Sequence, residues 1–211
     1  MTMTSTVPVT TRHRVRAAVL LPAVGLIAAA ATQIDAAIIT NAYRSESPAP
    51  KDSLNFPWYG GLAGQISTWW AFADLFLIIG FGALARSNAL RTSRIGRIGA
   101  WVAVLGAVTL ALANFLSAAN ADAMMSDGIG SAIGAMFGAG TILLGLGLTL
   151  AGVAVIRSAA WDGASRFIPL ANGIWCFVMV ALIFGNLLQV AIGVMAALQV
   201  ALGAALIAQE A

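Results

Sequence analysis

The chain of 211 residues is poor in reactive side chains, and each shortage excludes a class of chemistry. Its only cysteine, Cys176, cannot form a disulfide within one molecule, and a lone cysteine cannot hold zinc. Its only histidine, His13, excludes a haem held by two histidines of one chain. Its only lysine, Lys51, lies in a predicted loop, so no span offers an amine for a Schiff base. We therefore expect neither a metal nor a cofactor.

Catalytic motifs are also lacking. The sequence contains no HExxH, GxSxG or GK[ST] pattern, and no carboxylate lies near a histidine in a catalytic arrangement. Two aspartates in different apolar segments invite comparison with intramembrane aspartyl proteases. However, Ile34-Asp35-Ala36 and Ala73-Asp74-Leu75 lack the Tyr-Asp and Gly-x-Gly-Asp motifs of those families. An enzyme acting on lipids would need a nucleophile and a base, which the chain does not supply. We expect a protein that is not an enzyme.

Charged residues are rare in the chain, and apolar residues are abundant. Only 9% of residues are charged, 60% are hydrophobic and the mean hydropathy is +0.91. Soluble domains carry about 25% charged residues. The apolar runs predict an all-α polytopic transmembrane bundle with six spans, at residues 17–40, 66–85, 98–119, 130–156, 167–184 and 190–208. Residues 1–16 form a basic N-terminal tail and 209–211 a short C-terminal one.

The first apolar segment has a second interpretation. A basic start and the small residues Ala28–Ala31 resemble a cleavable signal peptide. We favour an uncleaved span, because the apolar stretch is long and further spans follow it.

Basic residues predict the orientation of the bundle. With the N-terminus inside, the cytoplasmic segments hold nine of the eleven basic residues and the outer segments hold Arg44 and Lys51. The nine are Arg12, Arg14, Arg16, Arg86, Arg91, Arg94, Arg97, Arg157 and Arg166. Basic residues of short loops concentrate on the cytoplasmic side of membranes. Both termini are therefore expected in the cytoplasm. Because the arginines flank apolar spans, we expect the lipid bilayer as partner and no nucleic acid.

Polar residues of the spans gather near the predicted outer surface. A lipid-facing carboxylate within a span costs about 2.5 kcal/mol or more, and no basic residue lies inside a predicted span to pair with one. One interpretation is an outward-open polar pocket for a small solute, an ion or a proton. The other is that these groups only join helices by hydrogen bonds. The candidate pocket residues are Asp35, Asp74, Gln33, Asn114 and Gln189.

Two further patterns suggest contacts. Gly130, Gly134 and Gly138 form a GxxxGxxxG stripe, which favours close helix packing, either within the chain or between two copies. The turn between the second and third spans holds four arginines, Arg86, Arg91, Arg94 and Arg97, which either contact anionic lipid headgroups or only set the orientation.

Short phrases of the sequence resemble a diffuse group of small actinobacterial integral membrane proteins. The phrases are Arg86-Ser87, Gly96-Arg97-Ile98-Gly99, Ala151–Arg157 and Trp161 followed by Arg166–Leu170. The likeness covers roughly residues 66–180. It implies a multi-pass protein of a bacterial plasma membrane and brings no activity or ligand. We therefore expect a membrane protein that binds or transports a small solute, an ion or a lipid through its outer polar pocket. The alternative is an accessory subunit that packs on a partner membrane protein, or on a second copy, through the glycine stripe.

Overall fold

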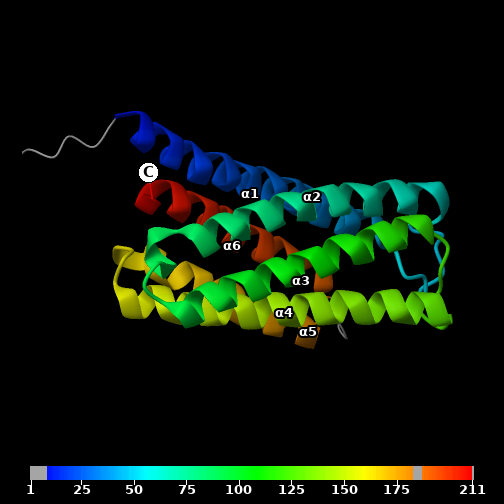
Figure 1. The fold of residues 1–211 in the computed structure, drawn as a ribbon. Helices are drawn as coiled ribbons and strands as arrows, with labels where there is room; N and C mark the ends of the chain where they lie inside the picture. The colour runs from blue at the N-terminus through cyan, green and yellow to red at the C-terminus, as the bar shows by residue number, and fades with distance from the viewer. Residues whose placement is uncertain (1–8, 183–186, 211) are drawn as a thin grey trace, which may run out of the picture.

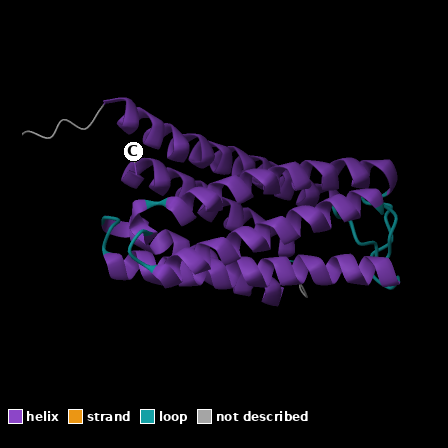
Figure 2. Ribbon diagram, viewed as in Figure 1, coloured by secondary structure: helices purple, strands orange, loops and turns teal. Residues whose placement is uncertain are grey.

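The computed structural model describes residues 9–182 and 187–210, and these ranges form a bundle of six long α-helices without a β-strand (Figures 1 and 2). The helices are α1 Val9–Tyr43, α2 Gly60–Arg86, α3 Arg94–Ala119, α4 Gly128–Ser158, α5 Ile168–Leu182 and α6 Leu188–Glu210. Two 3₁₀ turns, η1 Asn88–Leu90 and η2 Gly163–Phe167, precede α3 and α5. Each long helix, α5 together with η2, is long and apolar enough to cross a membrane. The expected all-α, six-span fold is confirmed, and the chain is a multi-pass membrane protein.

Several helices extend beyond the predicted spans. α1 begins at Val9 instead of residue 17, because no glycine or proline interrupts residues 9–21 and arginine is a good helix former. Part of the predicted N-terminal tail is therefore helical. α2 begins at Gly60 instead of residue 66, directly after the loop that contains Pro57. Residues 1–8, the corner at Gly185 and residue 211 lie outside the described residues.

The helices form a closed ring. Each packs against its neighbours in the sequence, and α6 returns to pack against α1. Short connections make sequence neighbours antiparallel and adjacent, as in other helical bundles. One apolar core joins all six helices. Its fully buried members include Leu26, Phe81, Ala103, Leu148, Cys176 and Leu202, one from each helix.

Close backbone contacts join α4 to both of its neighbours. A Cβ added at Gly147 would lie 2.3 Å from the backbone nitrogen of Ala103 in α3, and one at Gly173 in α5 would lie 2.4 Å from the nitrogen of Thr149. The absence of side chains at such positions lets two helix backbones approach. Gly106 makes a comparable contact with Leu144.

The predicted stripe lies before these contacts in α4. Gly130 abuts the carbonyl of Met124 in its own preceding loop, and Gly134 abuts the side chain of Met125. A Cβ at Gly138 would meet none of the described residues within 4 Å. The close glycine contacts of α4 with other helices therefore lie further along the chain than the stripe.

The two ends of the bundle differ in composition. The arginine end consists of the turns at residues 87–93 and 159–167, and the loop end consists of residues 44–59 and 120–127. In Figure 1 the arginine end lies at the left, beside the C-terminus, and the loop end at the right. α5 has 15 residues and α4 has 31, so their lengths are about 22 Å and 46 Å. The short α5 and the start of α6 stop well before the loop end (Figure 1).

Candidate functional site

Asn55 holds the long loop at residues 44–59 against two helices. Its Oδ1 accepts hydrogen bonds from Ser67 Oγ of α2 at 3.0 Å and from Ser117 Oγ of α3 at 2.6 Å. Its Nδ2 donates to the carbonyl of Ala121 at 3.2 Å. Both serines are buried, so Asn55 satisfies hydroxyl groups that water does not reach. The loop is thereby fixed over the helix ends.

The two loops of this end are also bonded directly to each other. Ser53 and Met124 form an isolated antiparallel bridge, and Leu54 N donates to Ala123 O at 2.9 Å. The carboxylate of Asp122 accepts from the backbone nitrogen of Gly60 at the start of α2, at 3.1 Å. The loop end is therefore an ordered cap on the bundle.

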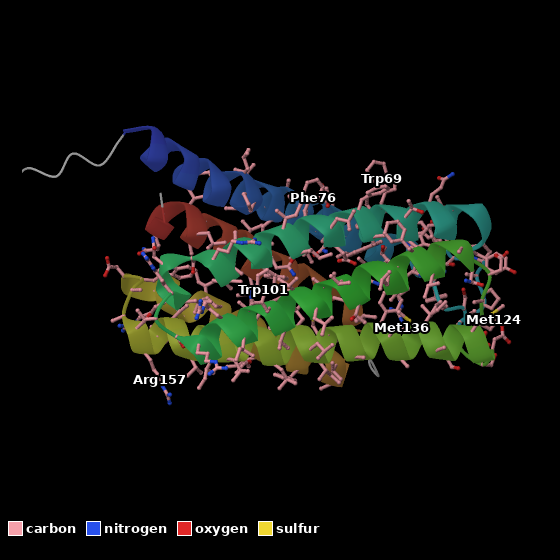
Figure 3. The ribbon with its side chains drawn as sticks, viewed as in Figure 1. Trp69, Phe76, Trp101, Met124, Met136 and Arg157 are labelled. Carbon is pink, nitrogen blue, oxygen red and sulfur yellow. The ribbon has the colours of Figure 1, made fainter. Side chains whose placement is uncertain are left out.

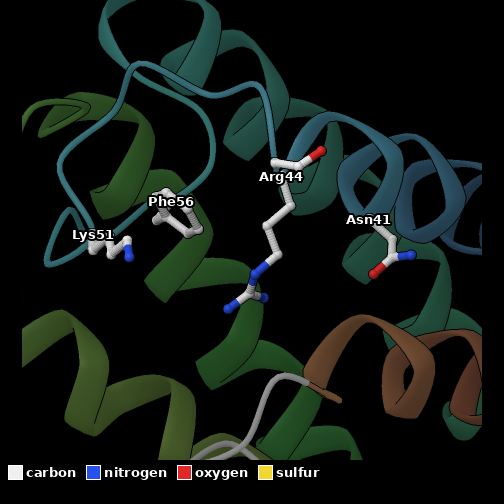
Figure 4. A pocket seen from close by; sticks show the side chains of 5 residues that line it. Asn41, Arg44, Lys51 and Phe56 are labelled. Atoms are coloured by element: carbon white, nitrogen blue, oxygen red, sulfur yellow. The ribbon is translucent and has the colours of Figure 1, made fainter.

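A cavity of about 570 Å³ opens under this cap, and we call it the loop-end cavity. Its lining consists of Asn41, Arg44, Ser45, Lys51 and Phe56. Figure 4 shows Arg44 extending from the end of α1 into the space, with Lys51 and Phe56 across from it on the loop. The Arg44 guanidinium lies 5.4 Å from the centre of the Phe56 ring, a cation–π distance. The volume is within the range of small-molecule sites.

A second cavity, of about 330 Å³, lies between α1 and α2, and we call it the α1–α2 groove. Its polar lining comes from α1 and its aromatic lining from Trp58, Trp69 and Trp70. The lining residues are Thr32, Gln33, Asp35, Ala36, Ile39, Thr40, Trp58, Ile66, Trp69, Trp70 and Ala73. Trp69 projects from α2 away from the bundle (Figure 3).

The predicted pocket residues divide among three places. Asp35 and Gln33 line the α1–α2 groove. Asp74 is buried and accepts a hydrogen bond from Asn114 Nδ2 of α3 at 2.8 Å, and the groove reaches Ala73 instead of Asp74. Gln189 is in the first turn of α6, where its Oε1 is buried without a partner among the described residues. The contact of Asp74 with Asn114 matches the interpretation that these groups join helices.

The four predicted headgroup contacts lie together at the arginine end. Arg86, Arg91, Arg94 and Arg97 are all exposed. Arg86 ends α2, and its guanidinium lies 5.3 Å from the centre of the Trp101 ring of α3. Arg157, at the end of α4, points away from the bundle (Figure 3). The arrangement presents several guanidinium groups around one end of the bundle.

The loop-end cavity is the feature that the sequence analysis missed. The sequence analysis identifies Arg44 and Lys51 as the basic residues of the predicted outer segments and does not predict that they share a recess. Within the described ranges, no group of three His, Cys, Asp or Glu residues could hold a metal ion. No family model, no curated protein and no solved structure matches this chain.

Proposed function

We propose that this chain is a non-enzymatic protein of a bacterial cell membrane that binds a small organic anion in its loop-end cavity, from the outer side. The loop-end cavity carries the proposal, because it places both outer basic side chains beside an aromatic ring. A carboxylate could accept hydrogen bonds from Arg44 and Lys51 while an apolar part packs on Phe56. Asn41 and Ser45 supply neutral polar groups for orientation.

The proposed orientation places both termini and the arginine end in the cytoplasm. Six arginines lie in the described turns of the arginine end or in the helix ends beside them, whereas the loop end holds Arg44 and Lys51. The six are Arg86, Arg91, Arg94, Arg97, Arg157 and Arg166. Such asymmetry favours a cytoplasmic arginine end, where anionic lipid headgroups would surround these side chains.

Binding fits the interior better than transport does. Between the two ends the core is filled by fully buried apolar side chains, among them Phe81, Leu84 and Leu148. The described residues therefore provide a recess at one end instead of a continuous polar path.

The test is calorimetric titration of the purified protein in nanodiscs with benzoate and, as a neutral analogue, benzyl alcohol. We expect saturable binding of benzoate and none of the alcohol. Lys51→Gln should weaken benzoate binding by about tenfold, since a hydrogen bond to a charged group contributes ~1.5–3 kcal/mol. Arg91→Gln, which removes a cation from the opposite end, is the matched control and should bind as the wild type does. Equal affinity of Lys51→Gln and wild type, or no saturable binding of benzoate, would contradict the proposal.

A second candidate function is that of an accessory subunit, supported by the open surface at Gly138. A Cβ there meets no neighbour within 4 Å among the described residues, so this part of α4 could receive another helix, from a partner protein or a second copy. Gly138→Leu should then abolish co-purification of a stoichiometric partner from gently solubilised membranes. Recovery of the same partner with the variant would argue against this role.

A further inference from the structure

The α1–α2 groove holds a carboxylate at a depth where carboxylates are costly. Asp35 lies eight residues before the end of α1, or about 12 Å along the helix. The Asp35 side chain is exposed, and among the described residues none donates a hydrogen bond to it or forms an ion pair with it. An exposed carboxylate within a span costs several kcal/mol unless something neutralises it. A cation bound beside Asp35 would offset this cost.

Aromatic rings line the same groove as Asp35. Trp58, Trp69 and Trp70 line the groove together with Asp35, and they are three of the six tryptophans of the chain. Indole is the best aromatic partner for a cation, and groups of aromatic rings bind quaternary ammonium ions. Trp58 is fixed in place, since its Nε1 donates to Thr40 Oγ1 at 3.3 Å and its ring stacks on Tyr43 at 4.9 Å.

A further polar group opens into the same groove. Gln33 is only 6% exposed and lines the cavity, yet no described residue forms a hydrogen bond with its amide. The polar atoms of this amide are not closed off, so they can bond water or a ligand head group in the groove. Thr32 adds a hydroxyl to the lining.

The walls of the groove face the bilayer. Trp69 is 75% exposed and Ile39 is 57% exposed, and both belong to membrane-spanning helices. Trp69 projects outward from α2 in Figure 3. A ligand with an alkyl chain could thus enter sideways from the lipid, with its head group at Asp35 and its chain in the adjoining lipid.

We propose that the α1–α2 groove binds the ammonium group of a membrane amphiphile, with the Asp35 carboxylate as counter-ion and the three tryptophans as an aromatic cage. This site is separate from the loop-end cavity and takes a ligand of the opposite charge. The failure of one proposal therefore leaves the other standing.

The test uses the full chain in dodecyl maltoside micelles, which contain no ammonium group. Tryptophan emission is recorded during titration with (4-bromobenzyl)dodecyldimethylammonium, whose ring bromine lies close to the ammonium group and quenches nearby indoles, and with 1-(4-bromophenyl)dodecan-1-ol, which has a similar ring and chain without the charge. We expect saturable quenching by the ammonium probe alone. Asp35→Asn should raise its half-saturating mole fraction by about tenfold. Glu46→Gln, which removes an exposed carboxylate of the nearby loop, should leave it unchanged.

Two further arms identify the cage and the source of the ligand. Trp69→Leu should reduce the saturable quenching, whereas Trp101→Leu, on α3 at the other end, should reduce only the total emission. Tetramethylammonium in the water phase should not displace the probe at equal concentration. Identical titrations of wild type and Asp35→Asn, saturable quenching by the alcohol, or displacement by tetramethylammonium would each overturn the proposal.

Discussion

Replacement of Gly147 by alanine should separate α3 from α4. The added Cβ would lie 2.3 Å from Ala103 N and 2.5 Å from Gly99 O, and both are backbone atoms that no side-chain rotation can move. Ordinary contact begins at 3.4 Å, so the two helices must move apart by about 1 Å. A radial gap of that size forfeits a quarter to a half of the dispersion attraction between the facing atoms.

The expected loss of stability follows from two opposing effects. Overpacking of a well-packed interior costs ~1–3 kcal/mol, and a clash between backbones belongs at the upper end of that range. Alanine gains about 0.5–1 kcal/mol over glycine in a helix interior. We therefore expect Gly147→Ala to lower the free energy of unfolding by about 2 kcal/mol. The assay is unfolding of the purified protein by SDS in dodecyl maltoside micelles, followed by circular dichroism.

Gly138→Ala is the matched control on the same helix. Its added Cβ has no neighbour within 4 Å in the described part of the chain, so only the gain in helix propensity remains, and stability should be equal to or slightly above that of the wild type. If Gly147→Ala proved as stable as Gly138→Ala, the close approach of α3 and α4 in this account would be refuted.

The polar contacts of the bundle yield two more predictions, both measured by the same unfolding assay. Asn55→Ala removes the acceptor shared by Ser67 and Ser117, and it should lower the free energy of unfolding by ~1–2 kcal/mol, since both hydroxyls are buried. An unchanged free energy of unfolding would show that Asn55 does not hold the loop there. Asn114→Leu leaves the buried Asp74 carboxyl without its partner and should cost ~1–3 kcal/mol, whereas the double variant with Asp74→Leu should recover much of that loss. A double variant less stable than the single one would contradict a merely structural pairing.

Hydropathy predicts the helices of this bundle well, because six apolar runs must each cross the hydrocarbon as a helix. It predicts helix ends less well. Nothing in hydropathy distinguishes a polar residue that extends a helix, such as Arg12 in α1, from one that ends it. The start of α2 at Gly60 likewise depends on how the preceding loop docks onto α3, through Asn55.

The candidate pocket shows what sequence spacing leaves open. Asp35 and Asp74 lie at comparable depth, which the sequence indicates, but depth does not say which way each helix is turned. In the structure Asp35 faces the α1–α2 groove, whereas Asp74 faces Asn114 of α3. Helix rotation is set by packing of the whole ring. The same rotation decides that Gly147, and not Gly138, meets α3.

The loop-end cavity depends on a long-range feature. Its lining comes from the end of α1 and from the loop at residues 44–59. The separation of Arg44 and Lys51 in the sequence gives no sign that their side chains line one recess. Only the folded loop brings them there.

The most direct test of the central claim is the side of the membrane on which each end of the bundle lies. In a Cys176→Ala background, Glu46→Cys and Thr92→Cys place single exposed thiols at the loop end and the arginine end, respectively. A membrane-impermeant maleimide added to intact spheroplasts should label the thiol at position 46, and should label the thiol at position 92 only after the membrane is permeabilised. Labelling of position 92 in intact spheroplasts, with position 46 protected, would contradict the account.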